Sequence, residues 1–327
     1  MANAENAKLQ YEAGQNVYTM SALADSGDAT VFTSSATLFS KKSGYAPDVR
    51  PNGLITGGAI TPAVSNTNDM VDVAALTCYL AGVKVAVAAD TDVSITRGLM
   101  TDTHNITSIT VKSDGTIEAV SGNDGTEFSE TRGAAGGPPL IPVGSIEIGQ
   151  VRTTSVDAAA VDDAEIVQVV GVHQERYDYP IFEIDYANAE VTFASALPLI
   201  HTGGVPKAVY ASYADPIFAD VQLSSDFVPA ETSHSVSSTQ VYGSTLGSTS
   251  SSLGQASFTA FLNDGIGDAL VGLKNAILWF KFFPDRYKSS YMLTQGKLGI
   301  SRTFPAGDNI QAACTISAES ESIEVSI

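Results

Sequence analysis

Histidines are the side chains in this sequence with the broadest catalytic range, and their spacing brings no two of them together. His104, His173, His201 and His234 lie far apart along the chain. None of them forms the His-x-x-x-His or His-x-x-Glu-His pattern that presents two imidazoles to one metal ion. We therefore expect the four histidines in loops or at the surface, and we predict neither a catalytic centre nor a metal site around them.

Other stretches that could carry chemistry are incomplete. The segment 243–247, Gly-Ser-Thr-Leu-Gly, lacks the lysine of a phosphate-binding loop and holds Thr245 where a nucleophile elbow needs serine. Two strings, Asp-Thr-Asp at 90–92 and Asn-Asp-Gly at 123–125, resemble fragments of calcium loops but lack the glutamate at the twelfth position. Hairpin turns commonly contain such strings. We predict that the protein is not an enzyme and that it binds no cofactor.

The net charge of the chain limits which classes of partner it can bind. The 327 residues carry a formal net charge of −19, which repels the phosphates of nucleic acid. The charge is uneven, because residues 226–327 hold nine acids and six bases and are therefore nearly neutral. We expect close contacts in that third of the chain and a solvated surface in the rest. DNA is expected to pass such a surface without specific binding.

The cysteines, the lengths of the apolar runs and the N-terminal residues indicate where in the cell the protein is found. Cys78 and Cys314 match no metal-binding spacing, so both are expected as small buried hydrophobes. No run approaches the roughly 18 to 20 apolar residues of a membrane span. The N-terminal residues lack the basic start and apolar core of a secretory signal. We expect no membrane partner and a chain that stays in the cytosol where it is made.

The elements that position these residues are mostly strands. Up to about residue 170 the chain alternates short β-prone stretches with Gly, Asp and Asn, which is typical of a β-sandwich or small barrel. The clearest of them are 71–80, 82–88, 92–96, 106–112 and 116–120, with the last two joined by a Ser-Asp-Gly turn. The glycines and prolines of 132–142 predict a loop. We predict a β-rich domain over 1–160, with part of 1–50 belonging to a second β domain over 161–327.

The second domain holds one ambiguous segment and one expected helix. Residues 233–252 are rich in serine and threonine and almost free of charge, so they are either a flexible linker or an extended hairpin arm. Residues 264–276 are expected as a helix, because Asn263 or Asp264 can cap it and apolar residues recur at helical spacing. We expect this helix to cover a β-sheet.

An aromatic run follows the expected helix. Residues 276–284, Ala-Ile-Leu-Trp-Phe-Lys-Phe-Phe-Pro, are β-prone on both faces. Such a strand lies in the middle of a sheet in an isolated subunit, or at a seam between subunits in a ring. Two further strands are expected at 295–304 and 309–316, separated by a turn at Pro305-Ala306-Gly307-Asp308.

This C-terminal part resembles the major tail (tail tube) proteins of long-tailed bacteriophages. The resemblance rests on the Ser/Thr-rich arm, the strand at 254–262, the capped helix, the aromatic strand and the closing pair of strands. It implies a tail-tube-like β-sandwich or barrel with one packed helix, forming hexameric rings that stack into a hollow tube for DNA. It also implies other phage tail proteins as partners, assembly in the host cytoplasm and a place in the virion tail. The residues expected at the subunit interface are Tyr242, Trp279, Phe280, Phe282 and Phe283.

Two other functions remain open. The β domain over 1–160 exceeds what a minimal tube protein needs, so the chain could instead be a decoration, baseplate or fibre-associated protein that binds a host surface glycan. A hydrolase that attacks surface polysaccharide through paired carboxylates is a third hypothesis. Rings or tubes in electron micrographs favour the first hypothesis, and glycan binding by the N-terminal domain favours the second.

Overall fold

The chain is mainly β, as the sequence predicts, and it divides into two compact units. The computed structural model describes residues 4–326. Unit 1 contains the N-terminal segment up to Val17, the segment Leu38–Ala46 and everything from Ala214 onward. Unit 2 contains Tyr18–Thr37 and Pro47–Tyr213. The expected division at 160 therefore differs from the structural one at 213, because strands after residue 161 pair with strands of the N-terminal half.

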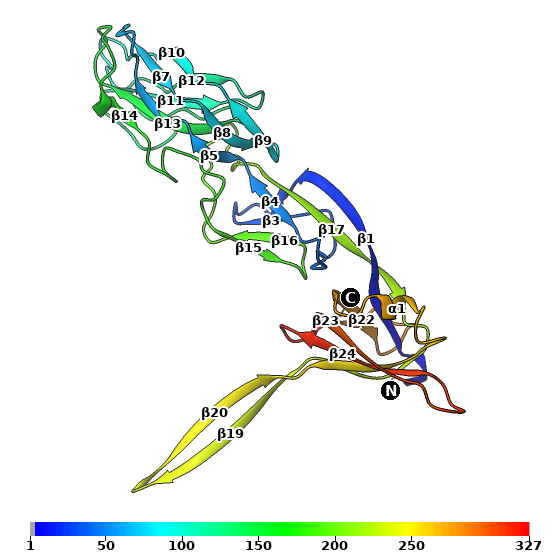
Figure 1. The fold of residues 1–327 in the computed structure, drawn as a ribbon. Helices are drawn as coiled ribbons and strands as arrows, with labels where there is room; N and C mark the ends of the chain where they lie inside the picture. Colours follow the sequence, from blue (N-terminus) through cyan, green and yellow to red (C-terminus); the bar gives the residue numbers. More distant parts are fainter. Residues whose placement is uncertain (1–3, 327) are drawn as a thin grey trace. The chain divides into compact units, whose positions relative to one another are not determined.

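Unit 1 is built around one sheet with a hairpin attached (Figure 1). Its sheet has the order β18-β21-β24-β23-β22-β1-β17, with β25 paired to β23. Strands β1 and β17 also carry residues of unit 2. The elements are the 3-10 turn η1 Ala4–Asn6, β1 Lys8–Ala22, β17 Val209–Asp220, β18 Ser224–Val228, β19 Thr232–Val241, β20 Ser244–Leu253, β21 Ala256–Phe261, α1 Ala269–Gly272, β22 Ile277–Phe283, β23 Tyr291–Thr303, β24 Gln311–Ala318 and β25 Ile323–Val325.

The core of unit 1 lies on one face of this sheet. In β24 the side chains alternate between buried and exposed, and the buried set includes Cys314 and Ile316. This period of two is what a half-covered antiparallel strand requires. Phe258, Phe280 and Leu298 from the neighbouring strands complete the apolar cluster.

The expected helix over 264–276 is wrong in length, since only Ala269–Gly272 is helical. The carboxylates of Asp264 and Asp268 together accept the main-chain N–H groups of residues 263–267. Short acidic side chains that bond to nearby N–H groups compete with helix formation in this way. The apolar residues of this segment still pack inward, since Leu270 belongs to the core of unit 1.

Unit 2 contains four small sheets, with the orders β10-β7-β6, β5-β8-β9, β12-β11-β13-β14 and β15-β16-β3-β2, while β4 pairs with β17. Its elements are β2 Ala24–Asp25, β3 Val31–Thr33, β4 Asp48–Pro51, β5 Gly53–Gly57, β6 Ile60–Pro62, β7 Met70–Val73, β8 Leu76–Leu80, β9 Val83–Val87, β10 Asp90–Ser94, β11 Asn105–Val111, β12 Ile117–Ser121, β13 Ile146–Thr153, the 3-10 turn η2 Asp163–Glu165, β14 Ile166–Val167, β15 Phe182–Asp185 and β16 Glu190–Phe193. Most strands expected from the sequence are present.

Strand β11 shows how the core of unit 2 is organised. All seven of its residues are buried, because it lies between β12 and β13 and both of its faces are covered. The expected Ser-Asp-Gly turn joins β11 to β12, and Gly115 adopts φ +85°, a conformation that favours glycine. Cys78 lies in the same apolar cluster, so its expected burial is confirmed, as is that of Cys314 in unit 1.

Candidate functional site

A long two-stranded hairpin, here called the arm (residues 232–253), is the first candidate functional element. The sequence left a linker and a hairpin open, and the structure shows β19 and β20 paired along their whole length. Gly243, at φ +80°, supplies the turn. Figure 1 draws the arm in yellow. Every described side chain from 233 to 252 is exposed, so the arm buries almost nothing against its own chain.

The two faces of the arm differ in chemistry. On one face serines lie directly opposite each other across the strands and their hydroxyls are hydrogen-bonded. These pairs are Ser233–Ser252 at 3.1 Å, Ser235–Ser250 at 2.7 Å and Ser237–Ser248 at 2.7 Å. The other face carries His234, Val236 and Gln240. The hydroxyl pairs stabilise the ribbon by a few tenths to about 1 kcal/mol each, without supplying a hydrophobic core.

Strand β22 carries four of the five residues expected at a subunit interface, and two of these are interior. Trp279 is 3% exposed and donates its indole N–H to the carbonyl of Phe39 at 2.8 Å. Phe280 is fully buried in the core of unit 1. Strand β22 lies between β23 and β1, which is the mid-sheet position that the sequence allowed. The expectation is corrected for these two side chains, because a side chain covered by its own subunit offers no surface to a neighbour.

The other three expected interface residues are accessible. Phe282 stacks on Phe227, with ring centroids 4.4 Å apart, and Phe283 packs beside Tyr291 at 5.3 Å. Both phenylalanines are half-buried. Tyr242 lies at the turn of the arm and is fully exposed. The five residues therefore do not form one site: Phe282 and Phe283 line the aromatic end of β22, and Tyr242 is at the tip of the arm.

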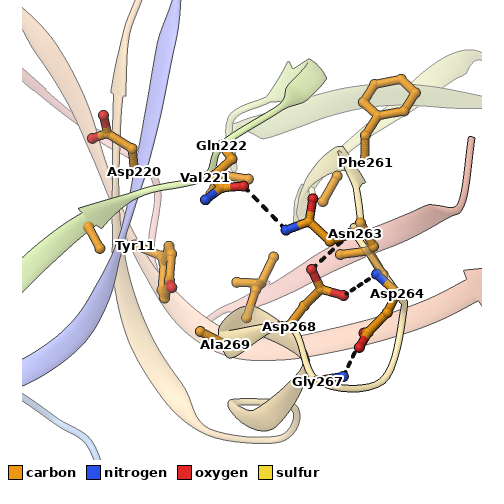
Figure 2. Close-up of a pocket in the computed structure, with 14 residues that line it drawn as sticks. Tyr11, Asp220, Val221, Gln222, Phe261, Asn263, Asp264, Gly267, Asp268 and Ala269 are labelled. Carbon is orange, nitrogen blue, oxygen red and sulfur yellow. Dashed lines mark hydrogen bonds between the residues drawn. The ribbon is translucent and has the colours of Figure 1, made fainter.

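A hollow of about 470 Å³ lies in unit 1 beside α1 (Figure 2). Asp220, Asp264 and Asp268 line it, which raises the question of carboxylate chemistry. The hydrogen bond from Gln10 holds the pKa of Asp220 below its usual range, and main-chain donors, led by the N–H of Asn263, lower that of Asp268. Neither of these two carboxyls keeps a proton at neutral pH to act as a general acid. The hydrogen bonds of Asp264 and Asp268 go to main-chain N–H groups of the loop before α1, so these two carboxylates hold that loop in place.

A second cavity, of about 210 Å³, lies in unit 2 over a buried polar cluster. Glu147, Glu175 and Lys207 line it and are all at least nine-tenths buried. The carboxylate of Glu147 accepts hydrogen bonds from Ser108 and Arg132. These three ionisable groups were missed by the sequence analysis, because they lie far apart in the chain and no motif connects them.

Two of the histidines, His173 and His201, lie in loops as expected, but both are buried. His201 is 2% exposed, and its Nε2 lies 2.9 Å from the carbonyl oxygen of Ser145. His173 is also buried, with Nε2 3.2 Å from a guanidinium nitrogen of Arg152. Burial lowers the pKa of His173, and the charge of Arg152 adds to this effect. Both histidines hold loops to the sheet of β13 and have no second imidazole beside them.

Among residues 4–326, no group of three or more His, Cys, Asp and Glu side chains is arranged to hold a metal ion. None of the helices in the described part of the chain is long and apolar enough to cross a membrane. Comparisons with protein-family models, with curated proteins and with solved structures give no match for this chain.

Proposed function

We propose that this chain is a structural virion protein, the tail tube subunit of a long-tailed bacteriophage. In this proposal copies of the chain form hexameric rings that stack into a hollow tube through which DNA passes. Unit 1 supplies the tube wall and contacts the other tail proteins. The number six and the phage setting come from the resemblance of residues 220–327 to tail tube proteins.

The arm is the observation that carries this proposal. A two-stranded hairpin is at best marginally stable alone in water, and this one has exposed side chains on both faces from 233 to 252. Its lack of Asp, Glu, Lys and Arg removes the charge repulsion that keeps soluble edges apart. A segment of this kind gains stability when another surface covers it. Identical copies are the occupant we propose, because the nearly neutral C-terminal third offers a surface without strong repulsion.

The free edge of the sheet in unit 1 is less suited to self-association than the arm. Strand β18 forms this edge, and its pairing with β21 is irregular between Ser225 and Val228. Asp226 lies in this irregular stretch at φ +55°. Bulges and charged residues at an edge hinder the addition of another strand. Assembly through the arm is therefore favoured over simple extension of the sheet at β18.

Charge is consistent with a passage for DNA. Each copy has a formal net charge of −19, so a ring of copies repels a duplex and offers no counterion release. DNA can therefore pass such an assembly without adhering to it.

The test is assembly of the full-length chain. We expect sedimentation velocity to show species that grow with concentration, and negative-stain electron microscopy to show rings or tubes. The matched variant lacks residues 235–250 and closes the hairpin between His234 and Ser251 with Asn-Gly, a favoured two-residue turn. This variant should remain a folded monomer. A full-length chain that stays monomeric at every concentration, without rings, would contradict the proposal.

A further inference from the structure

The cavity of unit 2 combines a charged interior with an apolar rim. Its interior holds Glu175 and Lys207, which are 7% and 2% exposed. Its rim includes Val172 and Tyr179, which are 61% and 52% exposed. Binding sites for small molecules typically have this composition, with apolar walls and a few well-placed polar groups. At about 210 Å³ the cavity has room for roughly seven water molecules, so its ligand is smaller than a drug-sized compound.

Glu175 leaves one hydrogen-bond acceptor unused. Its Oε2 accepts the main-chain N–H of Glu147 at 2.8 Å, while its Oε1 has no hydrogen-bond partner among the described residues. Glu147 itself is satisfied, since Ser108 and Arg132 both donate to its carboxylate. A buried acceptor without a partner is destabilising, and a ligand that donates a hydrogen bond to it recovers that loss.

Lys207 offers a donor in the same cavity. Its ammonium donates to the carbonyl oxygens of Arg176 and Tyr179, each at 2.7 Å, and an ammonium has a third N–H. Lys207 and Glu175 are near enough for each charge to oppose the effect of burial on the other group's pKa. The cavity therefore presents one acceptor and one donor of opposite charge. A ligand with a net charge is attracted by one of them and repelled by the other.

Tyr179 gives the rim a fixed aromatic surface. Its ring packs against the main chain of Gly171, where an added Cβ would lie 2.2 Å from a ring carbon. Gly171 has φ +77°, so the position favours glycine for conformational reasons as well. A half-exposed aromatic ring provides an apolar surface with little side-chain entropy to lose.

We propose that this cavity in unit 2 binds an uncharged polyhydroxylated ring of pyranose size, with one hydroxyl donating to Glu175 and another accepting from Lys207 while the ring's C–H face packs on Tyr179. A hydroxyl both donates and accepts, so a molecule with several hydroxyls can satisfy an acceptor and a donor that line one cavity. The ligand is either a free monosaccharide or the end of a glycan, since both present this chemistry. The site lies within unit 2 and does not depend on assembly through the arm.

The test uses the full-length protein and saturation-transfer NMR with a panel of probes. The panel contains glucose, galactose, mannose, N-acetylglucosamine, their methyl glycosides, methylammonium, acetate and glycine. We expect at least one neutral sugar to bind and the charged or zwitterionic probes not to compete with it. Binding of the methyl glycoside points to a glycan end, and its loss points to a free sugar; both support the proposal. Tighter binding of methylammonium, acetate or glycine, or no binding by any sugar, overturns it.

Substitutions of the residues that line the cavity test whether the sugar binds there. Glu175→Gln keeps an acceptor for the N–H of Glu147 and converts the free position from acceptor to donor, so affinity should fall about tenfold or more. Lys207→Met should have a similar effect. Tyr179→Ala removes only the rim, so it tests the site without changing the buried pair. The controls are Glu183→Gln in the same unit and Tyr287→Ala in unit 1, both exposed in the wild type and both expected to bind normally. Equal affinity across all variants would place the sugar elsewhere and overturn the assignment.

Discussion

The carboxylate of Glu12 accepts the main-chain N–H of Trp279 at 3.1 Å, just beyond the point where two strands stop pairing. The ladder between β1 and β22 ends at the pair Tyr11–Phe280. The side chain of Glu12 thus takes the place of a main-chain carbonyl at the next position. Its other oxygen accepts the hydroxyl of Ser40, so the carboxylate connects three segments of unit 1.

Replacing Glu12 with alanine should destabilise unit 1. The change leaves the N–H of Trp279 and the hydroxyl of Ser40 without their acceptor, and each buried group of this kind costs about 1–3 kcal/mol. Trp279 is the single tryptophan, so its fluorescence during urea unfolding reports this unit. The control is Glu324→Ala, which removes an exposed carboxylate of the same unit. Identical unfolding midpoints for both variants and the wild type would show that the Glu12 contacts contribute nothing.

Each unit has its own buried thiol, and the two should report unfolding separately. Burial raises the pKa of Cys78 in unit 2 to about 11 and that of Cys314 in unit 1 to about 12. Since the thiolate is the reactive form, we expect iodoacetamide at about pH 8 to leave both thiols unmodified in the folded protein. Peptide mapping by mass spectrometry along a urea series should then give one transition for each cysteine. Rapid modification without urea is the result that this prediction does not allow.

The strand pattern could be predicted from the sequence because it is local. Alternation over Gln311–Ala318 and the Ser-Asp-Gly turn after β11 specify their structures within a few residues. The helix over 264–276 failed since Asp264 and Asp268 bond to the main chain, which a count of apolar spacing does not detect. Local chemistry at the start of the helix outweighed its periodicity.

The buried cluster could not be predicted because its residues lie far apart in the sequence. Glu147, Glu175 and Lys207 meet only after β13 and two later loops have packed, and each residue alone resembles an ordinary surface charge. Likewise, the aromatic run predicted the correct strand. It could not predict that the indole N–H of Trp279 would donate to the main-chain carbonyl of Phe39. The accessible interface candidates Phe282, Phe283 and Tyr242 stay a prediction.

The buried pair in unit 2 should give its stability opposite slopes at low and high pH. Burial raises the pKa of Glu175, so the folded state keeps this proton where the unfolded chain, at its ordinary value of 4.5, has lost it. The unfolding free energy therefore falls as pH rises above about 4.5 toward the folded pKa. Burial lowers the pKa of Lys207 below 10.5, so the unfolding free energy rises with pH between the folded value and 10.5.

Glu175→Gln should remove the first of these slopes. The variant keeps a neutral side chain at every pH, so its stability relative to the wild type should increase as pH rises from 4.5. Urea unfolding followed through labelling of Cys78, compared between variant and wild type at each pH, measures the difference. Glu183→Gln is the matched control, and we expect its profile to run parallel to that of the wild type. A parallel profile for Glu175→Gln as well would mean that the carboxyl does not titrate abnormally.

Charge placed on the arm should separate folding from assembly. Val236 is 76% exposed on the arm and Val64 is 85% exposed in unit 2. We expect Val236→Asp and Val64→Asp to leave the stability of the monomer within about 0.5 kcal/mol, as surface changes usually do. If copies cover the arm, Val236→Asp should block assembly, because it buries an unpaired charge, while Val64→Asp assembles normally. Sedimentation velocity distinguishes the two, and assembly by both would count against contacts through the arm.

Because unit 2 lies between segments of unit 1 in the sequence, the two units are completed at different times during synthesis. Unit 2 is encoded between the segments of unit 1, so all its strands have emerged once Tyr213 is clear of the exit tunnel. Strand β24 sits between β21 and β23, so the sheet of unit 1 has a central gap until residues 311–318 are made. Domains fold as units during synthesis, N-terminal parts first. The sheet of unit 1 is therefore completed only after unit 2 and the arm have emerged, close to the end of synthesis.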